Sequence, residues 1–248
     1  MARVIDHGVP DMDEPILVEG LPGVGLVGKI AADHLVDELS MSHAASVRCD
    51  GLPEVAIYGA DDRAVQAPVR IYADADRELL VLQSDVPVSR TAASDFASCI
   101  VGWIDTVGAF PLFLSGLPVE DLSVDEVPTV YGVATGEGAA RLDTHDIDTP
   151  PERGLIGGPT GALLYAASAE DVDGAGLVVE SDPQFPDPAA ARSLLVGAIT
   201  PLADIDVSTE ALVEQSEQIR ESKERLAQQM QEAEEAESSQ ARPLRMYQ

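Results

Sequence analysis

The sequence has almost no cysteine and no long apolar segment. Cys49 and Cys99 are the only cysteines among 248 residues, and each stands in an apolar setting, so we expect two buried, reduced thiols. No apolar run approaches the roughly 18 residues that a membrane-spanning helix needs. The opening stretch, "MARVIDHGVPDMDEP", lacks the apolar core of a signal peptide. These absences predict a cytoplasmic protein that is not embedded in a membrane.

Basic residues are scarce as well. Fifteen Lys and Arg stand against 44 Asp and Glu, for a formal net charge of −29, and only Lys29 and Lys223 are lysine. The acids are spread along the whole chain. In molar salt the Debye length falls to about 3 Å, so self-repulsion is screened and hydrated carboxylates keep a protein in solution. The composition predicts a halophilic source and argues against a nucleic-acid partner, which needs a basic surface.

Short apolar runs alternate with helical patterns over most of the chain. The segments typical of strands are Pro15–Glu19, Ala45–Cys49, Val55–Tyr58, Val69–Tyr72, Glu78–Ser84, Phe110–Gly116, Thr129–Thr135 and Gly174–Ser181. Helices are expected at Leu26–Leu39, at Val88–Val107, within Gly154–Ala167, and after Asp187, with Asp187 as N-cap and Pro188 as first helical residue. This alternation predicts the α/β class: a three-layer α/β/α sandwich with a mostly parallel sheet.

The composition changes after residue 204. Residues 205–240 are polar and rich in helix formers, and Leu212, Ile219, Leu226 and Ala233 recur seven residues apart. The other half of that heptad seam is polar, so the coiled-coil pattern is weak. Pro243 ends any helix. The predicted organisation is an α/β/α domain at 1–204, an extended C-terminal helix at 205–240 and a flexible tail at 241–248.

The segment Gly20–Lys29, "GLPGVGLVGK", fits two nucleotide-binding patterns. Its Gly23, Gly28 and Lys29 spell G-x-x-x-x-G-K, which is most of a P-loop. The next residue is Ile30, where a P-loop has the Ser or Thr hydroxyl that coordinates magnesium. No strand that ends in a Walker-B aspartate is evident either. The P-loop interpretation is therefore disfavoured.

The same segment also spells G-x-G-x-x-G, the dinucleotide-binding pattern. It follows a predicted strand and opens a predicted helix, and Asp50 lies 22 residues past Gly28, near where a ribose-binding acid belongs. Pro22, however, interrupts the strand before the first motif glycine. A structural role, in a sharp turn from strand to helix and in close packing of that helix on the sheet, is the stronger interpretation. The residues of this structural glycine loop are Gly20, Pro22, Gly23, Gly25 and Gly28.

Other candidate sites are weaker. The histidines are scattered, and none stands at a metal-ligand spacing from a cysteine or an acid, so neither metal nor cofactor is expected. They are His7, His34, His43 and His145. Ser115 follows a predicted strand, but it lacks the G-x-S-x-G pattern of a nucleophile elbow. The residues alone thus predict no catalytic site.

Taken together, the motifs resemble the proteasome assembly chaperone family, in its archaeal branch. The resemblance starts with "VEGLPGVGLVGKIAADHLVDEL" and continues through "LLVLQSDVP", the helix that carries Trp103, "FLSG", "GLIGGPTGALL" and "PQFPDPAAARSLL". These segments follow the family's order over roughly residues 15–215. The resemblance implies an α/β/α sandwich without an established catalytic site, in which the glycines are a backbone signature. It therefore implies that the protein is not an enzyme.

The resemblance also directs attention to the last three residues, Met246, Tyr247 and Gln248. A hydrophobic residue, a tyrosine and any residue with a free carboxylate are similar to the C-terminal motif by which proteasome activators and some assembly chaperones dock. In that mode the tail enters a pocket between adjacent α-subunits of the 20S ring. The carboxylate pairs with a lysine, and the tyrosine packs against the pocket wall. A homo-oligomer, which the family also shows, would present several tails.

The expected function is that of a non-enzymatic proteasome assembly chaperone or activator-like adaptor that docks on the 20S α-ring through its C-terminal tail. The alternative is a nucleotide- or nucleoside-binding enzyme that uses the Gly20–Lys29 loop. A third interpretation is a scaffold that binds another partner through the long helix.

Overall fold

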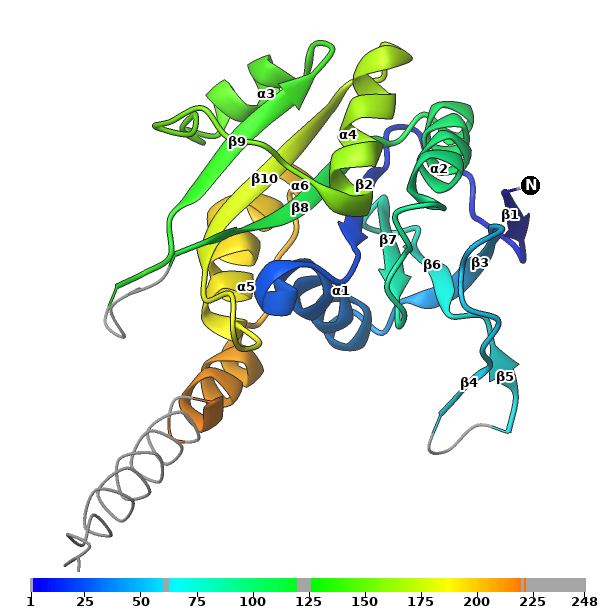
Figure 1. Cartoon of the computed structure of the whole chain (residues 1–248), viewed down its shortest axis with the longest axis horizontal. Coiled ribbons are helices and arrows are strands. Elements are labelled where there is room, and N and C mark those ends of the chain that lie inside the picture. The colour runs from blue at the N-terminus through cyan, green and yellow to red at the C-terminus, as the bar shows by residue number, and fades with distance from the viewer. Residues whose placement is uncertain (1, 60–62, 120–125, 220, 222–248) are drawn as a thin grey trace, which may run out of the picture.

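The computed structural model describes residues 2–59, 63–119, 126–219 and 221. Its centre is an eight-stranded sheet in the order β1-β3-β6-β7-β2-β8-β10-β9 (Figure 1). In chain order these strands are β1 (Arg3–Asp6), β2 (Ile16–Gly20), β3 (Ser42–Arg48), β6 (Val69–Asp74), β7 (Leu79–Ser84), β8 (Phe110–Pro118), β9 (Val130–Thr135) and β10 (Gly174–Ser181). Two further strands, β4 (Ile57–Tyr58) and β5 (Val65–Gln66), form a ribbon that projects from the body (Figure 1).

The middle of the sheet is parallel. β2 pairs in parallel with β7 and β8, and β8 pairs in parallel with β10. β6 is antiparallel to both β7 and β3, β1 is antiparallel to β3, and β9 is antiparallel to β10. The strands β2, β3, β7, β8 and β10 therefore all run in one direction. Every residue of β2 and β7 is buried, as expected of parallel strands that are covered on both faces.

Helices cover both faces of this sheet. On one face lie α1 (Val27–Glu38), α3 (Gly138–Thr144) and α5 (Pro188–Leu194), which continues through a π-helical turn at Leu195–Ile199 into α6 (Thr200–Ala203). On the other face lie α2 (Ala93–Val107) and α4 (Gly158–Ala169). Successive strand residues alternate between the layers: Val18 and Val81 pack with α1 and α5, whereas Leu17 and Leu80 pack with α2 and α4. This arrangement confirms the predicted three-layer α/β/α sandwich (Figure 1).

Most predicted elements are present, with shifted ends. The helix predicted from Val88 begins instead at Ala93, because Ser89 holds the preceding residues in a turn. The carbonyl and the hydroxyl of Ser89 both accept from the amide of Ala92, at 3.1 and 3.2 Å. The N-cap prediction is confirmed, since Asp187 accepts from the amide of Ala190 at 2.9 Å. The sequence does not predict the short elements β1, β5 and α3. β1 pairs with the distant strand β3, β5 pairs with β4, and α3 packs on β9 and β10.

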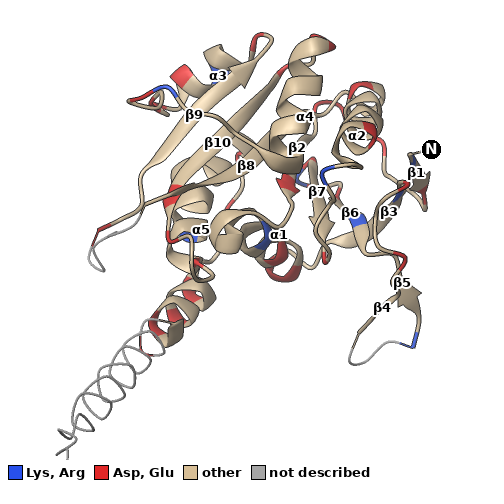
Figure 2. Cartoon of the chain, in the orientation of Figure 1, with Lys and Arg blue, Asp and Glu red and all other residues tan. Residues whose placement is uncertain are grey.

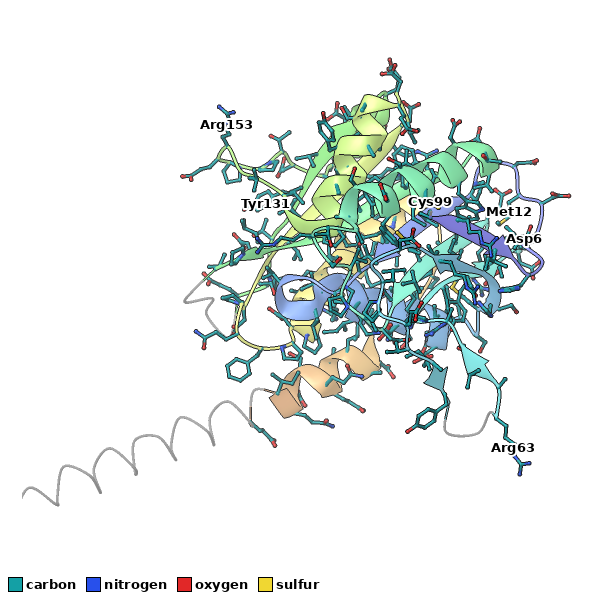
Figure 3. The ribbon with its side chains drawn as sticks, turned by 45° about the vertical axis from the view of Figure 1, so that its right-hand side comes forward. Asp6, Met12, Arg63, Cys99, Tyr131 and Arg153 are labelled. Atoms are coloured by element: carbon teal, nitrogen blue, oxygen red, sulfur yellow. The ribbon has the colours of Figure 1, made fainter. Side chains whose placement is uncertain are left out.

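The expectation of two buried thiols is wrong in part. Cys49 and Cys99 are free but only half-buried. Cys49 follows the end of β3, and Cys99 lies on α2, which packs against β1 (Figure 3). Partial burial raises the pKa of both thiols, so they are poor nucleophiles at neutral pH.

The predicted C-terminal helix begins on the core. The helix predicted from residue 205 starts instead at residue 210, because residues 205–209 are described and are not helical. Residues 210–219 are helical, and the rest of the predicted helix and the tail beyond them lies outside the described residues apart from residue 221. Leu212 is buried against the cluster that includes α1 and α5, and His34 donates from Nε2 to the carbonyl of Ser208 at 2.6 Å. Beyond this anchor the helix points away from the body (Figure 1, orange). The hydrophobic core that includes α1 and α5 therefore continues past residue 204. The domain boundary at residue 204 stays a prediction.

Within the described ranges, no helix is both long and apolar enough to cross a membrane. Acidic residues are distributed over helices and loops in many parts of the body (Figure 2).

This charge distribution predicts a stability that depends on salt. A net charge of −29 destabilises a compact fold through self-repulsion when screening is weak. The Debye length is about 10 Å at 0.1 M salt and about 3 Å at 1 M. We therefore expect the midpoint of thermal unfolding, followed by circular dichroism, to rise steeply between 0.1 M and molar KCl. A midpoint that does not change over this range would contradict a halophilic origin.

Candidate functional site

The glycine loop connects β2 to α1 through a short turn at Val24–Leu26. It lies at the carboxyl end of the parallel strands, where open α/β sheets form their ligand sites. This placement makes it the first candidate for a functional site. Whether the loop has room for a ligand depends on the protein atoms that surround its residues.

Two glycines let α1 lie close to the sheet. A methyl group on Gly20 would lie 2.1 Å from Cβ of Ala32 on α1, far inside van der Waals contact. A methyl group on Gly28 would lie 3.2 Å from Cβ of Leu114 on β8. Both positions therefore have a packing reason for glycine that involves no ligand.

Gly25 is the most constrained residue of the loop. Its φ of +60° lies in the left-handed region, and a methyl group there would lie 2.0 Å from Oγ of Ser181 at the end of β10. The carbonyl of Gly25 accepts from the amide of Asp187 at 2.8 Å. Asp187 also accepts from the hydroxyl of Ser181 at 3.1 Å. The turn is thus packed against protein atoms of β10 and of the loop before α5.

Gly23 and Pro22 differ from the other loop residues. Gly23 has extended backbone, with φ of −144°, and a methyl group there would meet no described atom within 4 Å. Pro22 is half-buried in the same turn. The steric argument for glycine therefore applies to Gly20, Gly25 and Gly28 but not to Gly23.

Lys29, the lysine of the P-loop pattern, takes part in an ion network on the protein itself. Its Nζ lies 2.9 Å from Oδ2 of Asp33 and 3.1 Å from Oδ1 of Asp85. Asp85 also pairs with buried Arg70 at 2.6 Å, and Gln83 bridges Arg70 to Asp33. Burial favours protonation of Asp85, but the hydrogen bonds and charges of Arg70 and Lys29 outweigh it and lower its pKa. The ammonium group is neutralised by carboxylates, which is the opposite of a phosphate-binding arrangement.

Asp50, the candidate ribose-binding acid, does not sit beside the glycine loop in the sheet order. It follows β3, and β6 and β7 separate β3 from β2. A dinucleotide site places this acid at the end of the strand next to the one that enters the glycine loop. The neighbour of β2 on that side is β7, which ends in Ser84.

Glu19 is a buried acid that sequence reasoning missed. It is the last residue before Gly20 and is 0% exposed. Its carboxyl accepts from the amides of Leu21 and Leu114, at 3.1 and 3.0 Å, and lies 3.1 Å from the hydroxyl of Thr160. It therefore joins the glycine loop, β8 and α4 through one side chain. An acid inside an otherwise apolar strand run is the signal that could have revealed it, because an acid is almost never fully buried unless it is paired.

Burial raises the pKa of Glu19 from 4.5 to about 8, against the hydrogen bonds from Leu114, Leu21 and Thr160. Because the folded pKa lies above the unfolded one, the contribution of Glu19 to stability is complete below pH 4.5 and declines as the pH rises toward 8. We expect Glu19→Gln, which stays neutral, to lose less stability than the wild type over this range. Thermal unfolding in molar KCl between pH 5 and 9 measures the difference. The exposed Glu170→Gln variant is the control, and a difference that is constant with pH would contradict the assignment.

The histidines are less scattered than the sequence suggests. The rings of His7 and His43 lie 5.1 Å apart, and both Nε2 atoms lie near Oγ of Ser46, at 3.0 and 3.1 Å. The ring of Tyr72 follows at 5.7 Å from His43. Partial burial is the main reason that the pKa of His43 is lowered. In the described part of the chain, no group of three or more His, Cys, Asp or Glu side chains is placed to hold a metal ion.

The predicted docking residues Met246, Tyr247 and Gln248 lie outside the described residues. Their role stays a prediction. The described residues nearest to them in sequence belong to the helix at 210–219 and residue 221.

Comparisons with known proteins extend over nearly the whole chain. Two uncharacterized proteins of Methanocaldococcus jannaschii are similar to it. One is 28% identical over 228 residues, which is 92% of this chain and 91% of the relative. The other is 30% identical over 219 residues, which is 86% of this chain and 84% of the relative.

Solved structures share the fold. PbaA of Pyrococcus furiosus, described as an archaeal homologue of proteasome-assembly chaperone, superposes with a TM-score of 0.77 and 28% identity, covering 94% of this chain and 100% of PbaA. PbaB of the same organism, described as an archaeal proteasome activator, has a TM-score of 0.75 and 24% identity, covering 91% of this chain and 98% of PbaB. At that identity PbaB supports the fold alone.

The PAC2 family model matches residues 17–227, from the strand that enters the glycine loop to beyond the last described residue. The match includes the glycine loop, Glu19, the ion network around Lys29 and α4. Because this range spans most of the chain and the fold agrees throughout, the chain belongs to the PAC2 family, as its resemblance to the proteasome assembly chaperones predicted.

Proposed function

We propose that this protein is a non-enzymatic proteasome assembly chaperone or activator-like adaptor. The observation that carries the proposal is the similarity to PbaA, at 28% identity over 94% of the chain. The surroundings of the glycine loop support the non-enzymatic part. Its lysine is paired with Asp33 and Asp85, and its turn is packed against Ser181. As a partner of the proteasome in a salt-rich cytoplasm, the protein would act through its surface and its termini.

The docking element in this proposal is the tail Met246–Gln248, which binds between α-subunits of the 20S ring. The helix at 210–219 supports it, because that helix is anchored on the layer of α1 and α5 and points away from the body (Figure 1). One short tail is a small epitope. A homo-oligomer that presents several tails to a ring of repeated pockets gains affinity through effective concentration.

The alternative function is a nucleotide- or nucleoside-binding enzyme that uses the Gly20–Lys29 loop. The position of the loop at the carboxyl end of β2 favours it. The paired Lys29 and the place of β3 in the sheet order weaken it. Calorimetric titration of the purified protein with ATP or NAD tests it, since micromolar binding that is lost in Gly25→Ala would favour the enzyme.

The proposal predicts a direct complex with proteasome subunits. Surface plasmon resonance in molar KCl, with 20S particles and free α-subunits from the same source, measures it. We expect saturable binding that becomes tighter at higher surface density, because several tails then engage at once. Absence of binding to both forms would contradict the proposed function.

A further inference from the structure

The histidine pair His7 and His43 lies at the edge of the sheet, on segments that are far apart in the sequence. His7 directly follows β1, and its amide continues the pairing with β3 by donating to the carbonyl of Ala44 at 2.8 Å. β1 lies at the edge of the sheet beside β3 (Figure 1). Main-chain pairing therefore fixes where the two imidazoles stand relative to one another.

A β-bulge brings Ser46 to the same face of the sheet as His43. The two residues are three positions apart, which in a regular strand would place them on opposite faces. The register of β3 against β6 shifts between His43 and Ala45, and before the shift His43 pairs with Tyr72. After the shift Ser46 pairs with Arg70, which lies on the same face of β6 as Tyr72. Bulges of this kind re-aim side chains and are frequent beside functional sites.

Nitrogen and oxygen donors gather around the hydroxyl of Ser46. Nε2 of His7 lies 3.0 Å from Oγ of Ser46, and Nε2 of His43 lies 3.1 Å from the same oxygen. The carbonyl oxygen of Ala45 lies 3.0 Å from Nε2 of His43. An ion bound at about 2.0–2.2 Å by each ligand holds neighbouring ligand atoms about 3 Å apart. Two imidazoles on one tetrahedral ion have ring centroids about 5 Å apart, and the two rings here are separated by 5.1 Å.

The surroundings of these donors favour a cation. His7 and His43 are both exposed, so an ion can reach them from solvent. Partial burial is the main reason that the pKa of His43 is lowered, and a neutral imidazole is the form that binds a metal. The charge of Arg70, which acts in the same direction, is balanced by Asp85 at 2.6 Å. The net charge of −29 raises the concentration of cations around the chain.

We propose that His7 and His43 bind one divalent transition-metal ion, with the hydroxyl of Ser46, the carbonyl of Ala45 and water as the remaining ligands. Imidazole suits zinc, nickel and copper, whereas magnesium prefers ligand sets of oxygen alone. The set contains two imidazoles and no third His, Cys, Asp or Glu among the described residues, so its affinity is moderate. A bound ion joins the segment after β1 to β3 and so fastens the edge of the sheet.

Calorimetric titration of the full chain with Zn²⁺ tests the site, in molar KCl and millimolar Mg²⁺ that occupy the acidic surface. We expect one ion to bind per chain at micromolar concentration. His7→Ala and His43→Ala should each weaken binding by about a hundredfold or more, since loss of even an outer partner of a ligand costs about 10–100-fold. Zn²⁺ at about a hundred times its dissociation constant should raise the midpoint of thermal unfolding of the wild type by about 5–10 °C. Neither variant should show this rise.

The matched control is His145→Ala, which removes the histidine that follows α3, near the opposite edge of the sheet. It should bind Zn²⁺ as the wild type does. Electron paramagnetic resonance of the wild type with Cu²⁺ needs no variant and should show coupling to two imidazole nitrogens.

Three results would overturn the proposal. They are no saturable binding of Zn²⁺ up to about 1 mM, unchanged binding in both His7→Ala and His43→Ala, and a Cu²⁺ spectrum with oxygen ligands only. No 20S particle enters these measurements, so their failure leaves the proposed function standing.

Discussion

A methyl group at Gly25 is expected to lower the midpoint of thermal unfolding by about 10 °C, whereas the same change at Gly23 should leave it almost unchanged. The left-handed backbone at Gly25 costs a residue with a side chain about 1–2 kcal/mol. Overpacking against Ser181 adds about 1–3 kcal/mol. Ser181 cannot turn away freely, because its hydroxyl donates to Asp187, which also caps α5. For a chain of this length 1 kcal/mol corresponds to about 2–4 °C.

Gly23→Ala is the control for this prediction, because Gly23 stands two residues away in the same motif but has extended backbone and open space. Circular dichroism melts of both variants in molar KCl measure the contrast. A dinucleotide site would need Gly23 as much as Gly25, because both belong to its G-x-G-x-x-G pattern. Equal losses at both positions would therefore contradict the packing interpretation of the glycine loop.

Tyr247→Ala is expected to abolish measurable binding to the 20S particle while the fold stays intact. Loss of a buried aromatic ring and its hydrogen bond costs about 2 kcal/mol or more per site, which is about thirtyfold in affinity. Every tail of an oligomer weakens together, so the loss is multiplied. One residue added after Gln248 should act in the same way, because it moves the carboxylate away from the pocket lysine. Surface plasmon resonance against 20S particles measures both variants.

Met246→Ala is the matched comparison within the tail. It removes apolar packing without a hydrogen bond or a charge, so its effect should be milder than that of Tyr247→Ala. Wild-type binding by both Tyr247→Ala and the extended chain would show that the tail is passive. Any contact with the proteasome would then lie on the α/β body or on the helix at 210–219.

The central strands and their helices could be predicted from the sequence because their signals are local. The apolar runs that became β2, β7 and the first half of β8 are buried on both faces, and a run of this kind predicts a parallel strand. The cap at Asp187 followed from the Asp-Pro pair before α5. The four-residue strand β1 could not be predicted in this way, because only its pairing with β3 defines it.

The site was harder to predict, because it depends on contacts between distant segments. Lys29 meets Asp85, and Gly25 meets Ser181, only after the sheet brings β2, β7 and β10 to one edge. The sequence motif alone therefore gives no distinction between its three glycines, although a methyl group on Gly23 would have no close neighbour among the described residues. Glu19 is one of 44 acids in the sequence, and the apolar run around it is the one sequence signal of the burial that the structure shows.

Docking of this protein on the 20S ring is tested most directly by capture of 20S particles on the immobilised protein in molar KCl. The full chain is compared with a chain that ends at Arg245 and so lacks Met246, Tyr247 and Gln248. We expect the full chain to retain the particles and the shortened chain to lose them, with the same unfolding midpoint and the same oligomer mass for both. Equal capture by the two chains, or capture by neither, would contradict docking through the tail.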